Sequence, residues 1–217
     1  MFAPRMTRST TRSTTRSTTR ALPRFGLLLA LTAFSACGGS RKQVLIDPVV
    51  SLAPHSRIGL VTFSSTGAKG SLATLATTRF AERLLGAQQG IEVLELGTVA
   101  GPLDAAAARR LGQEHGVRTI MVGQLTVSDI KPRVRILGGL SASTEVTLAL
   151  STRLMSTESG ATLWARSSTQ RETLQSVSLV NGTAVFDAQD PAEAYGEIVN
   201  ALVWNVTSDF RATWVRQ

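Results

Sequence analysis

The apolar run FGLLLALTAFSAC, from Phe25 to Cys37, constrains this chain more than any other stretch. Six arginines and no acidic residue lie between Arg5 and Arg24, directly before the run. A helix needs about 20 apolar residues to cross a bilayer, so the run is too short to remain as a transmembrane helix. A basic segment followed by a short apolar one is typical of an export signal. We therefore predict that residues 1–36 are a signal peptide; the alternatives are an uncleaved anchor or a buried core helix.

The only cysteine of the sequence, Cys37, closes this run and follows Ser35 and Ala36. This order is that of a bacterial lipoprotein signal, in which the cysteine becomes the first mature residue and carries acyl chains. Phe34 departs from the leucine that is usual at its position. Gly38 stands where an aspartate is associated with retention in the inner membrane. The predicted location is therefore the outer membrane, with a lipid anchor at Cys37 and the protein facing the periplasm.

The net charge changes once the signal is set aside. The whole chain has 23 basic and 15 acidic residues, or +8, but without the six arginines residues 37–217 have 17 minus 15, or +2. This small excess gives no reason to expect a nucleic acid as partner. A single cysteine excludes an intramolecular disulfide. The two histidines, His55 and His115, are too few and too far apart to indicate a metal cluster.

Residues 37–217 are enough for one domain with a hydrophobic core. The first part, residues 37–56, contains Gly-Gly-Ser, a basic pair, Pro48 and Pro54, and is predicted to be a tether that carries the lipidated Cys37. His55 is expected to be exposed in it. The segment Val44–Val50 is apolar enough to dock on the domain instead. A single α/β domain is predicted for residues 57–217.

The first half of this domain alternates strands and helices. Apolar runs at residues 58–63, 91–96 and 119–125 predict buried strands, and the segments 72–85 and 103–115 predict helices between them. Ser71 is the expected N-cap of the first helix, and Asp104 and Gly116 mark the ends of the second. Gly67, Lys69, Gly70 and Ser71 invite comparison with a phosphate-binding loop, but the order G-x-x-x-x-G-K-[S/T] is absent, so a helix N-terminus is the favoured interpretation. The order β-α-β-α-β predicts a largely parallel start of the sheet.

The second half predicts antiparallel hairpins and a long terminal helix. Residues 126–150 alternate around Gly138-Gly139, residues 146–155 match 161–169 across a turn at 158–160, and 174–180 match 183–186 across Asn181-Gly182. Asp190-Pro191-Ala192-Glu193 begins a helix. Its apolar stripe consists of Tyr195, Ile198, Leu202, Val206 and Phe210, while Trp204 and Trp214 lie off the stripe, at a core edge or a contact surface. The predicted fold class is α/β, with a mixed sheet, a β-α-β-α-β start, C-terminal antiparallel hairpins and a long terminal helix.

Three sequence features suggest a family: the strand IGLVTF, a helix ending in EHGV before the strand TIMVGQL, and the turn Ser156–Gly160 before Leu163-Trp164. With these features, residues 57–214 and Cys37 resemble the family of the curli secretion lipoprotein (CsgG). The same order is similar to the related lipoprotein B activators of penicillin-binding proteins and to the N-terminal domain of TolB. None of these motifs is specific by itself.

The resemblance implies two competing functions. In the secretion members, two hairpins insert in the outer membrane and form a channel shared by a ring of subunits; the corresponding segments here are 130–144 and 167–187. The residues proposed for the first hairpin, as a membrane or partner contact, are Val134, Ile136, Gly138, Gly139 and Leu140. Lys131–Leu137 is shorter than the roughly 9 to 11 residues of a membrane strand. We therefore favour an adaptor or assembly factor that binds other envelope proteins, with a homo-oligomer as a further option.

An enzyme is the weakest of the three classes. The sequence has no G-x-S-x-G elbow, and neither histidine is accompanied by a nucleophile motif. We predict no catalytic residue, no cofactor and no metal. The expected partners are the membrane, through acylated Cys37, and other envelope proteins, without nucleic acid.

Overall fold

The chain divides into two units, Met1–Ser40 and Arg41–Gln217. The computed structural model describes residues 42–101, 103–135, 141–175 and 177–216, all of them in the second unit. Cys37 and the predicted signal peptide lie outside these residues. The described part is a mixed α/β fold, as the sequence predicts.

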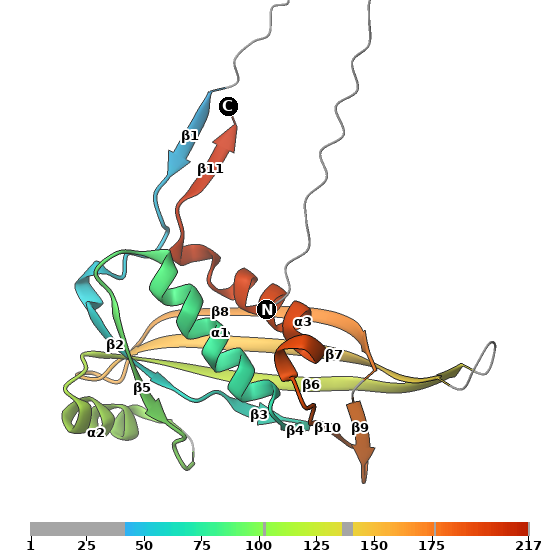
Figure 1. The fold of residues 1–217 in the computed structure, drawn as a ribbon. Coiled ribbons are helices and arrows are strands. Elements are labelled where there is room, and N and C mark those ends of the chain that lie inside the picture. Colours follow the sequence, from blue (N-terminus) through green and yellow to red (C-terminus); the bar gives the residue numbers. More distant parts are fainter. Residues whose placement is uncertain (1–41, 102, 136–140, 176, 217) are drawn as a thin grey trace, which may run out of the picture. The chain divides into compact units, whose positions relative to one another are not determined.

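The main sheet has the strand order β5-β2-β6-β7-β8, with β3 pairing on β6 (Figure 1). Its strands are β2 (Arg57–Val61), β3 (Ser64–Thr66), β5 (Glu92–Gly97), β6 (Thr119–Arg135), β7 (Ser141–Ser156) and β8 (Thr162–Leu174). The β2, β5 and β6 strands run parallel, while β6, β7 and β8 are antiparallel neighbours. The β-α-β-α-β start is therefore confirmed, and so is the change to antiparallel pairing after it.

Helices cover both faces of this sheet, but not to the same extent. The α1 (Leu72–Ala87) and α3 (Pro191–Val206) helices share the large apolar core with one face. The α2 helix (Ala105–His115) packs Ala108 and Leu111 on the other face, over a smaller cluster around Ile120 and Met155. All five residues of the predicted terminal stripe are buried, the last of them in η2 (Ser208–Phe210).

Two of the three expected helix starts are confirmed by hydrogen bonds. The Asp104 carboxylate accepts from the Ala107 N–H at 2.8 Å, and the Asp190 carboxylate accepts from Ala192 and Glu193. The cap expected at Ser71 is wrong. Its backbone is already helical, with φ −78° and ψ −9°, and its hydroxyl instead donates to the Phe186 carbonyl at 3.2 Å.

The strands of all three predicted hairpins pair, although Gly138-Gly139, the predicted turn of the first hairpin, lies outside the described residues. The β6–β7 ladder extends to the pair Arg135 and Ser141, and β7 pairs with β8 along its length. The third hairpin joins β9 (Val177–Val180) to β10 (Thr183–Phe186), with positive φ at Asn181 and Gly182 as a tight hairpin turn requires. The β10 strand also pairs in parallel with β4 (Ala68–Gly70), which attaches this hairpin to the start of α1.

The region assigned to the tether has structure from residue 42 onward. The β1 strand (Gln43–Ile46) pairs with β11 (Thr213–Arg216), and η1 (Ala53–His55) follows. Of the segment Val44–Val50, for which docking on the domain is the alternative, only Val50 packs against the core, and Val44, Leu45, Ile46 and Val49 are exposed. The chain docks just after this segment, at Leu52, which is fully buried. His55 is half-buried rather than exposed, because η1 packs it against the domain; burial, then the charge of Arg118, lowers its pKa.

Candidate interaction surfaces

The longest exposed edge of the main sheet is β8. It has 13 residues and pairs only with β7; no other described strand lies on its outer side. Most of its side chains are exposed. A strand of this length presents a row of main-chain N–H and C=O groups that another chain can pair with.

The sheet face opposite α1 and α3 is polar where α2 does not cover it. The side chains of β6, β7 and β8 on that face are mainly small or hydroxylated, in contrast to the leucines and valines of the covered face; they include Gln124, Ser151, Arg153, Ala165 and Ser167. This alternation is typical of an antiparallel sheet with one face in water.

A cleft of about 860 Å³ lies on this polar face. Its walls are the chain after β2 (Val61, Thr62 and Ser64), the loop Val99–Asp104, and β6, β7 and β8. The β2 strand is central, and the chain leaves it toward β5 by α1 and returns to β6 by α2. The cleft is thus at the carboxyl end of parallel strands where the winding direction changes, which is the usual ligand position in open α/β sheets.

The groups in the cleft do not make a catalytic set. Its lining residues contain no histidine or cysteine, and their single acid, Asp104, accepts the hydrogen bond that caps α2. Arg153 donates to the Leu103 carbonyl at 3.3 Å and so holds the loop before α2. The lining combines apolar side chains with hydroxyl groups, a composition suited to binding a ligand.

The predicted hairpin site is only partly described. Val134 lies in β6, opposite Ala142 of β7, whereas Ile136, Gly138, Gly139 and Leu140 lie outside the described residues. Asp129, with φ 50°, interrupts the ladder, and five residue pairs follow this bulge, from Lys131 to Arg135. An ion pair between Arg133 and Glu145 crosses the arm, and Arg133 is exposed.

The second segment compared with a membrane hairpin, residues 167–187, does not act as one unit. Its first part, up to Leu174, belongs to β8 of the main sheet. Its last part places Ala184 and Phe186 of β10 in the core, where the Phe186 ring packs edge-on against Tyr195 at 5.5 Å. Burial, then the charge of Asp187, raises the pKa of Tyr195.

Trp204 forms a basic and aromatic cluster with two arginines. Its ring is half exposed, with the Arg211 guanidinium carbon 3.3 Å and that of Arg83 5.0 Å from the ring centroid. Burial, then the like charge of Arg83, lowers the pKa of Arg211. In the described part of the chain neither arginine has an ion-pair partner, and Nη1 of Arg211 is buried without a hydrogen bond. The surface at Trp204, which the sequence predicts to be a core edge or a contact surface, therefore carries positive charge without an ion-pair partner among the described residues.

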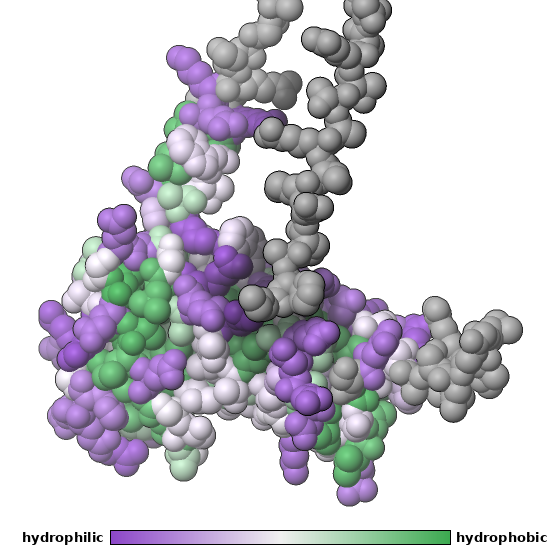
Figure 2. Space-filling model, viewed as in Figure 1, coloured by the Kyte–Doolittle hydropathy of each residue, from purple (hydrophilic) through white to green (hydrophobic). Residues whose placement is uncertain are grey.

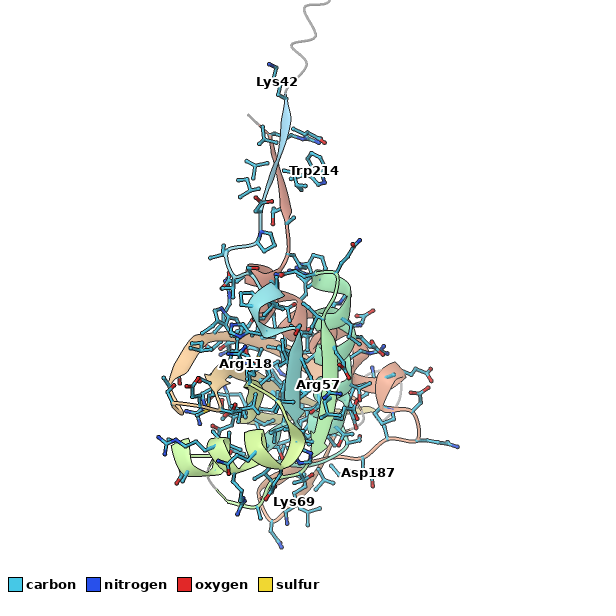
Figure 3. All side chains as sticks on the ribbon, turned by 90° about the vertical axis from the view of Figure 1, so that its left-hand side faces the viewer. Lys42, Arg57, Lys69, Arg118, Asp187 and Trp214 are labelled. Carbon is cyan, nitrogen blue, oxygen red and sulfur yellow. The ribbon has the colours of Figure 1, made fainter. Side chains whose placement is uncertain are left out.

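Apolar side chains are exposed on the β1–β11 ribbon, a surface that the sequence did not indicate as a pair. All eight residues of the two strands are exposed, and Leu45 lies opposite Trp214. Figure 3 shows Lys42 and Trp214 on this ribbon. The ribbon joins the domain at Val50–Leu52 and Phe210, which we call its foot. The side-chain amide of Gln88 holds this foot: it donates to the carbonyls of Val50 (2.8 Å) and Phe210 (3.1 Å) and accepts from the Leu52 N–H (2.8 Å).

Asp209 connects this foot to the edge strand. Its carboxylate accepts from Trp164 Nε1 at 3.1 Å and pairs with Arg166, both on β8, while its carbonyl accepts from the Val50 N–H at 3.0 Å. Burial raises the pKa of this carboxyl, but the hydrogen bonds from Trp164 and Arg166 outweigh it and hold the pKa below its ordinary value.

In the described residues no helix is long and apolar enough to cross a membrane.

No protein-family model and no curated protein matches this chain. Among solved structures, a dodecamer of PelC from Paraburkholderia phytofirmans is 13% identical, over 79% of this chain and 99% of that one, with a TM-score of 0.47. The lipoprotein GNA1162 from Neisseria meningitidis is 22% identical over 54% and 83%, with a TM-score of 0.35. The C-terminal domain of LpoB from Salmonella enterica is 13% identical over 54% and 84%, with a TM-score of 0.38. These likenesses are too low to argue from, and the resemblance to the curli secretion lipoprotein stays a sequence-based prediction.

Proposed function

We propose that this chain is an outer-membrane lipoprotein, held by acyl chains on Cys37 and facing the periplasm, that acts as a non-enzymatic adaptor or assembly factor. It binds another envelope protein along the open edge of β8. The observation that carries this proposal is the length of that edge, 13 residues with a neighbour on one side only.

An open edge binds through the main chain. A partner strand that adds to β8 gains regularly spaced hydrogen bonds, and pockets beside the edge give side-chain specificity. The cleft supplies such a pocket, because Ala165 and Ser167 of β8 form one of its walls. Their small side chains allow close approach of the incoming strand.

The same edge is protected against indiscriminate pairing. Arg171 and Glu172 place opposite charges near its end, and Arg166 is already held by Asp209. Charged residues on an edge strand oppose aggregation and make binding depend on a complementary partner. This favours a specific adaptor over a surface that is merely left uncovered.

The observations on the hairpins favour the adaptor over a secretion channel. The arm of β6 and β7 beyond the bulge has five described residue pairs, against about 9 to 11 residues for a membrane strand. The β9–β10 hairpin is attached to the core by Ala184 and Phe186, and releasing it would expose both.

The anchor is tested by replacing Cys37 with alanine in the full chain expressed in its host. We expect the protein to lose its acyl mass and to leave the membrane fraction. The measurement is fractionation together with intact mass spectrometry. Undiminished, lipid-modified Cys37→Ala protein in the membrane fraction would overturn the anchor.

The adaptor role is tested with a photoreactive amino acid at Ser167, which is exposed on β8, and at Gln113, exposed on α2, as the control. We expect a discrete crosslink in living cells at Ser167 and none at Gln113. Mass spectrometry identifies the partner, or a second copy of the chain if the edge self-assembles. Identical, diffuse products at both positions would contradict a binding edge.

A further inference from the structure

The β1–β11 ribbon is apolar on both of its faces. Four residue pairs form it: Gln43 with Arg216, Val44 with Val215, Leu45 with Trp214 and Ile46 with Thr213. Neighbouring residues of a strand point to opposite faces, so Leu45 and Trp214 lie on one face and Val44, Val215 and Ile46 on the other. Trp214 is 64% and Ile46 51% exposed. Figure 2 shows hydrophobic surface along the ribbon and hydrophilic surface at its outer end.

A ribbon of this kind needs a cover. An isolated two-stranded hairpin is marginal in water, and here no turn connects the two strands. The rest of the described domain contacts the ribbon at its foot, through Val50 and Phe210, and leaves all eight strand residues exposed. What covers the ribbon must therefore come from outside the domain.

The chain before the ribbon indicates which cover is within reach. Lys42 follows Cys37 by five residues, which span at most about 18 Å when fully extended. If Cys37 carries acyl chains in a bilayer, the ribbon stays close to that bilayer whatever the conformation of the linking residues. A protein partner would have to reach the ribbon by diffusion, whereas the anchor keeps the bilayer within this distance.

The composition of the ribbon fits the interface of a bilayer. Tryptophan is enriched at the level of the lipid head groups, and basic residues there meet phosphate. Lys42 and Arg216 lie at the outer end of the ribbon and Arg211 precedes β11, whereas the acids Asp47 and Asp209 lie at the foot, where Asp209 is already paired with Arg166. The other exposed apolar strand, β9 with Leu179 and Val180, is followed instead by Asp187 and Asp190. The exposed Lys69 of β4, which pairs with β10, partly offsets these acids, so an anionic surface would attract the first region more strongly than the second.

We propose that the β1–β11 ribbon is a second membrane contact, which lies in the head-group region of the bilayer that holds acylated Cys37. This inference rests on the proposed lipid anchor. Leu45, Ile46 and Trp214 are buried among the upper acyl chains, and Lys42 and Arg216 pair with lipid phosphate. The Arg83, Trp204 and Arg211 cluster offers a further phosphate contact, because its positive charge has no acidic partner in the described residues. The domain is thereby oriented on the membrane and not only tethered to it.

The test uses the mature protein that the host produces from the full-length gene, purified in detergent and transferred to vesicles of phosphatidylethanolamine and phosphatidylglycerol. Lipids brominated near the top of their acyl chains quench tryptophans that reach this depth. We expect quenching, and we expect most of it to be lost in Trp214→Phe. Ile46→Asp should weaken the quenching, whereas Val180→Asp, at an equally exposed position of β9, should not.

The outcomes separate the ribbon from the anchor. Acylation is read from the intact mass of the same sample. A chain that is acylated and bound to vesicles but shows no quenching through Trp214 overturns the ribbon contact and leaves the anchor intact. A chain without acyl groups overturns the anchor and, with it, the approach of the ribbon to the membrane. Self-association in detergent that Ile46→Asp abolishes would show that a second copy covers the ribbon, and would also overturn the membrane contact.

Discussion

Two short β-ribbons of this domain have the same strand pairing but differ in how far their side chains are buried. The β9–β10 and β1–β11 ribbons are both antiparallel and both have four residue pairs. In β10, Ala184 and Phe186 are fully buried under the domain, whereas every residue of β1 and β11 is exposed. A tight turn joins the first ribbon, while the strands of the second come from opposite ends of the described chain.

The difference shows that the pairing of strands does not by itself reveal what stabilises them. The β9–β10 hairpin is part of the domain core and should share its free energy of unfolding. The β1–β11 ribbon contributes little apolar burial to the domain, so its stability depends on whatever covers it. The first ribbon is therefore structural, and the second is suited to an external contact.

The largest test of this contrast is to truncate one aromatic residue in each ribbon. Phe186→Ala should lower the free energy of unfolding by about 3–5 kcal/mol, because it leaves a cavity beside Tyr195. Trp214→Ala should change it by no more than about 0.5 kcal/mol in the absence of lipid. Urea unfolding of the two purified variants measures both. Similar losses for the two variants would contradict the contrast.

A second test acts on the attachment of the β9–β10 hairpin to the start of α1. Gly70 has φ +102°, and a Cβ placed on it would lie 1.8 Å from the Phe186 carbonyl oxygen, so the β4–β10 pair would have to separate. We expect Gly70→Ala to cost about 3 kcal/mol, from strain and the lost pairing. Gly90 is the matched control, because it has φ +78° and a Cβ added to it would meet no atom within 4 Å; its replacement by alanine should cost about 1 kcal/mol. Equal costs would mean that β4 does not hold the hairpin.

A third test concerns the foot of the β1–β11 ribbon and depends on pH. The pKa of Asp209 is lowered in the folded state, so its ionised form stabilises the fold above the ordinary pKa of 3.8 and this contribution disappears as the pH falls through the lowered value. At pH 7 Asp209→Asn should lower the free energy of unfolding by about 1–2 kcal/mol, because it weakens the bonds to Trp164 and Arg166. The difference in free energy of unfolding between the native chain and Asp209→Asn should narrow below about pH 4. Urea unfolding at a series of pH values measures it.

His55 requires a control in that experiment. Its pKa is lowered, so the folded state favours the neutral ring, and stability should decrease as the pH falls below the ordinary value of 6.5. In His55→Gln this decrease in stability below pH 6.5 should be absent. A gap between the native chain and Asp209→Asn that stays constant down to pH 2 would show that Asp209 does not act through its charge.

The smallest expected effect is a difference in hydrogen exchange. Without lipid, the amides of β1 and β11 should exchange through local opening, far faster than those of β10, which pairs with strands on both sides. Mass spectrometry of peptides from the two ribbons measures this. Protection of β1 and β11 equal to that of β10, in a monomeric sample without lipid, would mean that the domain itself stabilises the ribbon.

Local sequence signals predict most of this fold, because they concern neighbours in the chain. Alternating apolar residues, turn residues such as Asn181-Gly182 and the cap Asp190 each act over a few residues, and the structure agrees with them. Ser71 is the exception: its hydroxyl donates to the carbonyl of Phe186, 115 residues further along the chain, and a partner at this distance leaves no pattern in the residues around Ser71. The pairs β1–β11 and β4–β10 join distant strands of three or four residues, too short for periodicity to identify. The cleft likewise depends on the packing of loops, for which no sequence signal exists.

Gln88 also determines how the domain would respond to mechanical force. A force applied to the chain before Lys42 would be transmitted through the backbone of β1. The β11 strand, which pairs with β1, would bear little of this force. The force would enter the domain at Val50 and Leu52, where one glutamine side chain holds three main-chain groups and Leu52 is buried. The force that the tethered domain can bear should therefore depend on the contacts of Gln88 at the end of α1 and not on the strand pairing within the ribbon.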